Sequence, residues 1–186
     1  MISTMIISIG IAEISNIVKG YVACDGVLKT AAVEMVMAQP VCPGKFIMIF
    51  GGSVASVDAA CDYVKDVFSE YIIDVQKFGN IEKRVFDGLN GASSGKCTGA
   101  LGIVETFSAA SCILAADAAL KAANVELCDI RIARGMGGKS YVSVTGTVGA
   151  VTAAVDAGAL KAMKDGLLVD RDVIASPHED MWQYLQ

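Results

Sequence analysis

The sequence has no long apolar run, although 54% of its 186 residues are hydrophobic and its mean hydropathy is +0.53. A membrane-spanning helix needs about 18 consecutive apolar residues, and the runs here are short, as at 46–50 and 167–169. The first 14 residues lack a basic segment, so we expect no signal peptide and no membrane span. We therefore expect the surplus apolar surface at subunit interfaces, which in obligate complexes resemble a domain core cut in half.

Basic clusters are also missing. Fifteen Lys and Arg residues against 20 Asp and Glu residues give a net charge of −5, whereas nucleic-acid-binding proteins display clustered Lys and Arg. We therefore expect no nucleic acid partner. The six cysteines form no Cys-X-X-Cys pair, which favours free thiols in a reducing compartment over a disulfide framework.

Groups that could carry catalysis are few. His178 is the only histidine, and a histidine with no neighbouring nucleophile is weak evidence for catalysis. Glu13 and Glu105 stand at matching positions of a repeat, where polar satisfaction or an interface is a better explanation than an acid–base pair. The sequence therefore predicts that this protein is not an enzyme.

The chain contains one pattern written twice. Residues 9–13 read IGIAE and residues 101–105 read LGIVE, at an offset of 92 positions. The same offset aligns Asp25 with Asp117, and it grows to 94 and then 96 toward the end of each copy. A period this long indicates a duplicated domain and not a solenoid. The Gly/Ser-rich residues 88–99 read as a linker, so we expect domains at 1–93 and 94–186.

Each copy predicts the same order of elements. Apolar residues at helical spacing alternate with short β-rich runs, and a Gly-containing turn separates the second and third runs. The expected strands and helices are 6–14, 17–32, 34–41, 45–51, 54–68 and 72–77 in the first copy, and 100–106, 109–123, 126–133, 139–145, 148–162 and 167–174 in the second. This βαββαβ order predicts an α+β, ferredoxin-like layer with helices on one side of a mostly antiparallel sheet. Exposed sheet edges and small-residue helix faces favour self-association into a closed ring.

These motifs resemble the bacterial microcompartment (BMC) shell domain. The resemblance rests on residues 9–13, on 25–31 (DGVLKTA), on 52–57 (GSVASV) and on their second copies, and it covers nearly the whole chain twice. The strand-first order resembles the unpermuted form of the domain. The resemblance implies a tandem-domain, pseudohexameric homotrimer that tiles with other shell proteins around a compartment in the cytoplasm. It also implies possible redox enzymes of the lumen as partners.

The resemblance further implies an iron–sulfur cluster, of the 4Fe–4S type, at the central pore. The turn 41–45 (VCPGK) matches the family's cysteine turn, which makes Cys42 the expected cofactor and metal ligand. Pro43 restricts the backbone of Cys42 and Gly44 permits a tight turn, so the thiol is expected at a rigid hairpin tip, with Lys45 near enough to favour a thiolate. One cysteine per chain could hold a cluster only if three chains met on an axis. From spacing alone, a plain thiol is the simpler interpretation. We expect the other cysteines in core positions, except Cys97 in the linker.

The matching turn of the second copy is rich in glycine. Residues 134–140 (RGMGGKS) nearly spell a nucleotide-binding P-loop, but Ala133 stands where the first glycine belongs. Duplication explains the turn better, because its lysine matches Lys45. We expect both turns to line the pore, through Val41, Pro43 and Gly44 in the first copy and Gly135, Met136, Gly137 and Gly138 in the second. The repeated Lys29 and Lys121 are expected at subunit edges, as the resemblance implies.

Three functions remain open at this point. The first is a shell building block whose pore carries a cluster for electron transfer or cluster delivery. The second is a shell building block with a metal-free pore for metabolites. The third, of another class and less favoured, is a small nucleotide-binding enzyme built on residues 135–140.

Overall fold

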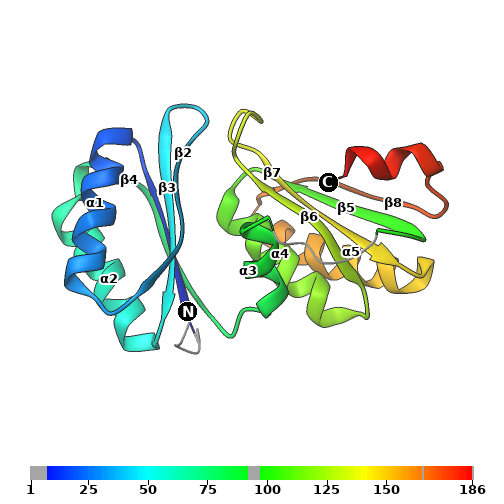
Figure 1. Ribbon diagram of the computed structural model, residues 1–186, viewed down its shortest axis with the longest axis horizontal. Coiled ribbons are helices and arrows are strands. Elements are labelled where there is room, and N and C mark those ends of the chain that lie inside the picture. The colour runs from blue at the N-terminus through cyan, green and yellow to red at the C-terminus, as the bar shows by residue number, and fades with distance from the viewer. Residues whose placement is uncertain (1–7, 92–96, 165, 186) are drawn as a thin grey trace. The chain divides into compact units, whose positions relative to one another are not determined.

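The computed structural model describes residues 8–91, 97–164 and 166–185 (Figure 1). The chain forms two compact units that divide between Ile81 and Glu82. The expected domain boundary between residues 93 and 94 lies outside the described residues. Every helix in the described ranges is too short or too polar to span a lipid bilayer.

The first unit is a four-stranded antiparallel sheet covered on one face by two helices (Figure 1). Its strands lie in the order β2-β3-β1-β4. The elements are β1 (Ser8–Ile14), α1 (Ile17–Thr30), β2 (Glu34–Val41), β3 (Lys45–Gly52), α2 (Val54–Val67), the 3-10 turn η1 (Ser69–Tyr71) and β4 (Ile72–Gly79).

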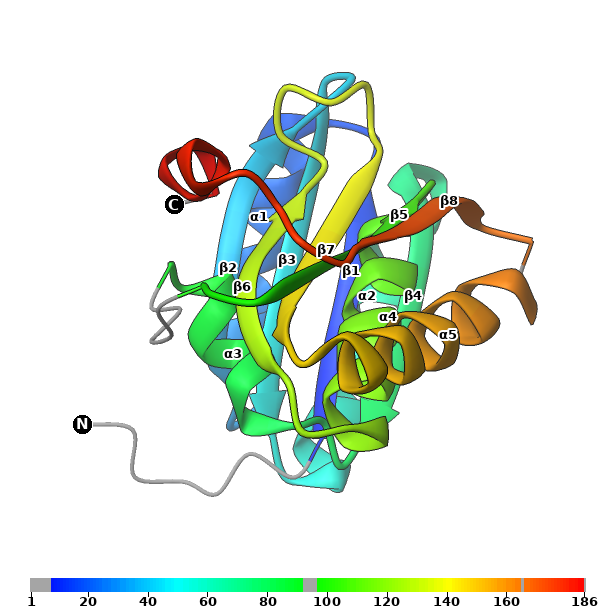
Figure 2. The same cartoon turned by 90° about the vertical axis from the view of Figure 1, so that its right-hand side faces the viewer.

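The second unit repeats this plan and adds a helix before it. Its strands lie in the order β6-β7-β5-β8 (Figure 2). The elements are α3 (Lys83–Leu89), β5 (Ala100–Thr106), α4 (Ala109–Ala122), β6 (Glu126–Ile132), β7 (Ser140–Gly146), α5 (Val148–Lys164), β8 (Leu168–Ile174) and the 3-10 helix η2 (Glu179–Tyr184). The predicted α+β class and the βαββαβ order are confirmed in both units, with element bounds within about two residues of those expected. Residues 6 and 7 of the first expected strand lie outside the described residues.

The irregularities of the two sheets are duplicated too. The pairing of β1 with β4 shifts register after Glu13, and that of β5 with β8 shifts after Glu105. Because one-residue bulges are specific features of a fold, their recurrence at the 92-residue offset supports duplication of one domain.

Local sequence sets where three of the main helices begin. A polar side chain precedes each, and its oxygen accepts a hydrogen bond from a backbone N–H in the first turn. The capping residues are Asn16 for α1, Ser53 for α2 and Ser108 for α4. These N-caps satisfy donors that the first turn of a helix leaves unpaired.

Glycines allow the helices to approach the sheet and each other. In the first unit, a Cβ at Gly20 of α1 would lie 2.2 Å from the ring of Phe46 of β3. In the second, a Cβ at Gly158 of α5 would lie 2.8 Å from the carbonyl oxygen of Ala115 of α4. Substitution there would push a side chain against backbone, so the close packing of α4 and α5 requires glycine at 158.

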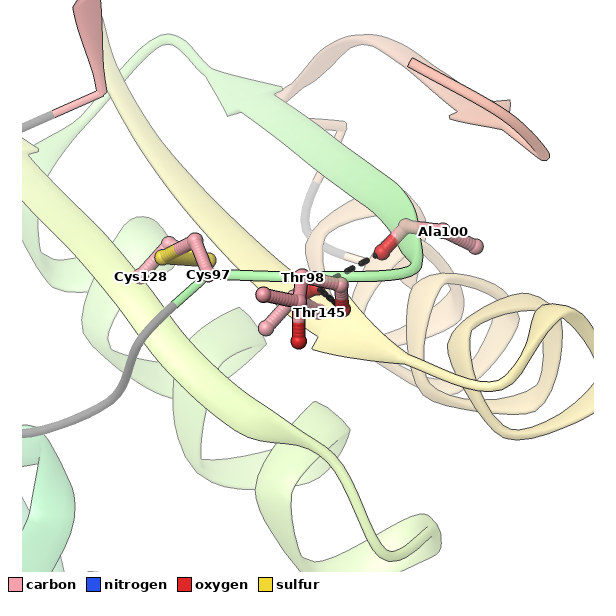
Figure 3. The surroundings of a disulfide bond; sticks show 5 residues. All are labelled: Cys97, Thr98, Ala100, Cys128 and Thr145. Carbon is pink, nitrogen blue, oxygen red and sulfur yellow. Dashed lines mark hydrogen bonds between the residues drawn. A yellow bond between two sulfur atoms is a disulfide. The ribbon is translucent and has the colours of Figure 1, made fainter. Parts of the chain in front are cut away.

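One disulfide joins Cys97 to Cys128 on β6 (Figure 3). The expectation that all cysteines are free thiols is therefore wrong for this pair. The residues are 31 positions apart in sequence and have no diagnostic spacing, but the fold brings their Cα atoms to 5.8 Å. The adjoining segment is fixed by Thr145, whose hydroxyl donates to the carbonyl oxygen of Ala100 at 2.8 Å.

Candidate functional site

The tip of the β2–β3 hairpin presents Cys42. Val41 is buried in the first unit, whereas Pro43 and Gly44 are exposed and Cys42 is half-buried as a free cysteine. The Cys42–Pro43 peptide is cis, and Gly44 has a φ of +78°, a left-handed conformation that glycine adopts without strain. The turn thus holds a thiol at the surface of its unit on a short, conformationally restricted segment.

Lys45 forms an ion pair with a carboxylate. Its Nζ atom lies 3.5 Å from Oε2 of Glu13 on the neighbouring strand β1. The second unit repeats this pair, with Lys139 Nζ 2.6 Å from Oε1 of Glu105. Of the two expected roles of these glutamates, polar satisfaction or an interface, the ion pairs show the first, because each glutamate neutralises the lysine that closes its hairpin turn.

The remaining free cysteines are poor metal ligands. Cys61 and Cys112 are buried and Cys24 is half-buried. Burial raises the pKa of all three thiols by desolvating the thiolate, most strongly at Cys112. Since metals bind the thiolate form, Cys42 is the best-placed thiol donor among the described residues.

The described part of one chain contains no complete metal site. Among residues 8–91, 97–164 and 166–185, no group of three or more His, Cys, Asp or Glu side chains could hold a metal ion. Cys42 has the donor chemistry that an iron–sulfur cluster uses, but it supplies one ligand where such clusters take several thiolates. The residues present therefore fit a cluster only if several chains each contribute Cys42.

The turn between β6 and β7 carries the second set of expected residues. Gly135 and Gly137 are exposed and Met136 is half-buried. Lys139 N–H donates to the carbonyl oxygen of Met136 at 3.1 Å, which closes the turn. A P-loop leads from a strand into a helix whose N-terminus faces the phosphates, whereas this turn leads into β7. The hairpin geometry therefore argues against the nucleotide-binding interpretation.

Lys29 and Lys121 make equivalent contacts. Lys29 Nζ lies 2.6 Å from Oδ2 of Asp25, and Lys121 Nζ lies 2.8 Å from Asp117, each pair one turn apart on its helix. The Lys29 pair is largely exposed, whereas the carboxylate of Asp117 is mostly buried. The two turns and the two lysines thus divide between the units, one of each in the first and one of each in the second.

Comparison with protein families decides what this repeated unit is. The model of the BMC domain matches residues 8–79 and again residues 100–177. The chain belongs to the BMC domain family. The resemblance drawn from the sequence motifs is confirmed, and each compact unit contains one BMC domain.

Some relatives match this chain over nearly its full length and others over about half of it. Over 178 residues, the chain is 41% identical to the bacterial microcompartment shell protein PduT of Citrobacter freundii, covering 96% of this chain and 97% of the relative. It is also 45% identical over 87 residues to the shell protein PduA of the same organism, covering 46% of this chain and 90% of the relative. A microcompartment protein from Desulfitobacterium hafniense DCB superimposes with a TM-score of 0.91 at 41% identity, over 96% of this chain and 99% of that one. The chain is thus similar to the shell protein PduA over about half its length and to PduT over nearly all of it.

The helix α3 packs on the second BMC domain through contacts that no sequence motif indicates. Arg84 donates through Nη1 to the carbonyl oxygen of Val125 at 2.7 Å and through Nη2 to that of Leu120 at 3.2 Å. The backbone N–H of Glu82 donates to Oδ1 of Asp117 at 2.7 Å. In the sequence this stretch lies between the expected strand 72–77 and the Gly/Ser-rich residues 88–99, and its one repeated signal is Phe86, which matches Trp182.

His178 has a local structural role. Its Nδ1 accepts a hydrogen bond from the backbone N–H of Asp180 at 3.3 Å and so caps η2. The histidine thus caps the segment that follows the second BMC domain.

Proposed function

We propose that this chain is a structural shell protein of a bacterial microcompartment, located in the shell within the cytoplasm. It assembles as a homotrimer whose six BMC domains form a pseudohexamer, and it tiles with other BMC shell proteins. The single observation that carries this proposal is the match of two BMC domains in a chain similar to the shell protein PduT over 96% of its length.

We further propose that the hairpin turns line a central pore. The first turn contributes Cys42, Pro43 and Gly44, with the expected Val41 buried behind them, and the second contributes the glycine-rich segment 135–138. The exposure of both turn tips supports this role, as does the matched Lys–Glu pair beneath each tip. Lys29 and Lys121 would lie at subunit edges.

In this proposal, Cys42 from three chains holds a 4Fe–4S cluster at the pore. Such a cluster, when bound, exchanges single electrons at a potential set by its surroundings. The chain itself supplies one thiol per subunit on a restricted turn, and Pro43 and Gly44 leave that thiol accessible. The function would be electron transfer to lumenal redox enzymes, or delivery of a cluster across the shell.

The assembly is tested by the mass in solution. Light scattering or native mass spectrometry of the intact chain should give three times 19.3 kDa. A monomer at micromolar concentration would contradict the trimer, and with it any cofactor shared between chains.

The cofactor is tested on anaerobically purified protein. We expect broad visible absorbance from thiolate-to-iron charge transfer, with roughly four irons per three chains. Cys42→Ser should lose both signals and remain trimeric, whereas the matched Cys24→Ser should keep both. A colourless trimer after full iron and sulfide supply would contradict the cluster and favour a metal-free pore for metabolites.

A further inference from the structure

The two BMC domains differ in how one matching face is covered. In the second domain, α3 lies against α4 and β6 (Figure 1). Leu120 of α4 is 4% exposed there, and Val125, which leads into β6, is buried. A Cβ at Gly88 of α3 would lie 2.5 Å from Leu127 and 2.9 Å from Ile130, so α3 meets this face at very short range.

The same face of the first BMC domain is open in the described chain. Leu28 of α1, which matches Leu120, is 48% exposed. Val33 and Met35, which match Val125 and Leu127, are half-buried where their counterparts are buried. The α1/β2 face, defined by Leu28, Val33, Met35 and Ala38, therefore presents apolar surface that the second domain covers with α3.

The chain also carries a segment equivalent to α3 that buries little in its own domain. Residues 178–185 follow β8 as residues 82–89 follow β4, so Trp182 matches Phe86 and Leu185 matches Leu89. No residue of η2 is buried, and Tyr184 is 80% exposed. This segment thus offers apolar and aromatic side chains for a surface outside its own domain.

We infer that residues 178–185 of one chain dock on the α1/β2 face of the first BMC domain of a second copy of this chain. The contact would repeat between chains what α3 does on the second BMC domain within a chain.

Polar groups at the two places correspond. Asp117 accepts the N–H of Glu82 at the start of the α3 segment. Asp25 stands at the equivalent position of the first domain, with its carboxylate largely exposed. His178 is the residue that matches Glu82, so its backbone N–H is the donor that would meet Asp25 of the second copy.

The sizes of the facing side chains are reversed between the covered face and the open face. In the second domain, Gly88 of the covering segment faces the large Ile130. At the matching positions, the segment has the large Tyr184 and the face has the small Ala38. Because close-packed contacts must conserve total volume, this exchange is expected if the C-terminal segment occupies the α1/β2 face.

The contact joins unlike surfaces, since each chain offers its C-terminal segment and receives another on its first domain. Contacts of this heterologous kind close into rings when the rotation between subunits permits. The inference rests on the proposed assembly of chains but not on the cluster, so loss of colour in Cys42→Ser would leave it untouched.

Photo-crosslinking tests the contact directly. Tyr184→p-benzoylphenylalanine is introduced into the full chain, and ¹⁴N- and ¹⁵N-labelled proteins are mixed through a dissociation step before irradiation. We expect crosslinked peptides from residues 17–38 that pair one light chain with one heavy chain. The same probe at the exposed Phe107 should not capture these peptides. Crosslinks confined to a single chain, or directed to other segments, would overturn the inference.

A charge placed on the face gives a second test. Leu28→Glu should raise the dissociation constant of the assembly at least about tenfold, because the carboxylate would lose water without gaining a partner. The emission of Trp182, the only tryptophan, should shift to the red as its side chain returns to water. Val67→Glu, on the exposed part of α2, serves as the control for an added charge. Unchanged emission together with unchanged assembly in Leu28→Glu would also overturn the inference.

Discussion

The two BMC domains of this chain share a fold and differ in what surrounds it. The second domain has α3 on its α4/β6 face, a disulfide between Cys97 and Cys128, and closely packed helices at Gly158. The first has an open α1/β2 face, and in it Tyr63 of α2 lies against Gly26 of α1. The two domains thus share one scaffold. The residues that differ between them stabilise the second domain and leave an apolar face of the first domain uncovered.

The largest test of this difference compares Leu120→Ala with Leu28→Ala. Leu120→Ala should lower the free energy of unfolding of the second domain by about 2–5 kcal/mol, because it leaves a cavity beneath α3. Leu28→Ala should cost the dissociated chain less than about 1 kcal/mol, because its side chain is half in water. Urea unfolding at low protein concentration, followed by Trp182 fluorescence and circular dichroism, measures both. Equal losses would contradict the difference in covering.

Opening the disulfide should affect the second domain alone. Cys97→Ser releases a cross-link between residues 31 positions apart, which should lower stability by about 2–4 kcal/mol. A phosphine reductant should shift unfolding of the native chain by a similar amount and leave the variant unchanged. An unfolding transition that does not respond to the reductant would show that the bond contributes nothing.

The helix contact of the second domain gives a smaller effect. Gly158→Ala should cost about 1–3 kcal/mol, because the new methyl group meets the backbone carbonyl of Ala115 and cannot be accommodated by a side-chain rotation. Gly149→Ala on the same helix places its methyl group in open space and should instead add about 0.5 kcal/mol. Thermal unfolding of the two variants gives the difference, and a Gly158→Ala protein as stable as the native chain would be inconsistent with the packing described.

The common scaffold could be predicted from the sequence because duplication makes each element appear twice. The strand pattern at 9–13 occurs again at 101–105, so both copies support the same assignment, and the cap residues Asn16 and Ser108 mark the same helix start in each. The position of Cys42 at a hairpin tip could be predicted from its neighbours Pro43 and Gly44, which favour a tight turn.

What could not be predicted is what the copies do not share. Cys97 pairs with Cys128 through tertiary proximity that spacing does not encode. The fold of α3 depends on acceptors about 40 residues away, such as the carbonyl oxygen of Val125 for Arg84. A local pattern contains no trace of such partners, and the repeat itself obscured them because the matching segment folds as the 3-10 helix η2.

The smallest expected effect concerns the Lys–Glu ion pair at the base of each hairpin. It tests whether the length of the pair or the burial of its carboxylate determines how much the pair stabilises its domain. Lys139 lies closer to Glu105, at 2.6 Å, than Lys45 lies to Glu13, at 3.5 Å. Distance alone therefore predicts that Lys139→Met is the more harmful change. Glu13, however, is only 8% exposed, and a buried carboxylate that loses its partner should cost about 1 kcal/mol.

Glu105 is more exposed, and water can replace the Lys139 ammonium there. Lys139→Met should therefore lower the free energy of unfolding by about 0.5 kcal/mol. We therefore expect Lys45→Met to destabilise its domain more than Lys139→Met does. Added salt should reduce the effect of Lys139→Met first, because exposed charges are screened more strongly. Urea unfolding of both variants at low and high salt measures the order. The reverse order would mean that the shorter pair, and not the more buried carboxylate, dominates the stability of the hairpins that present the two turns.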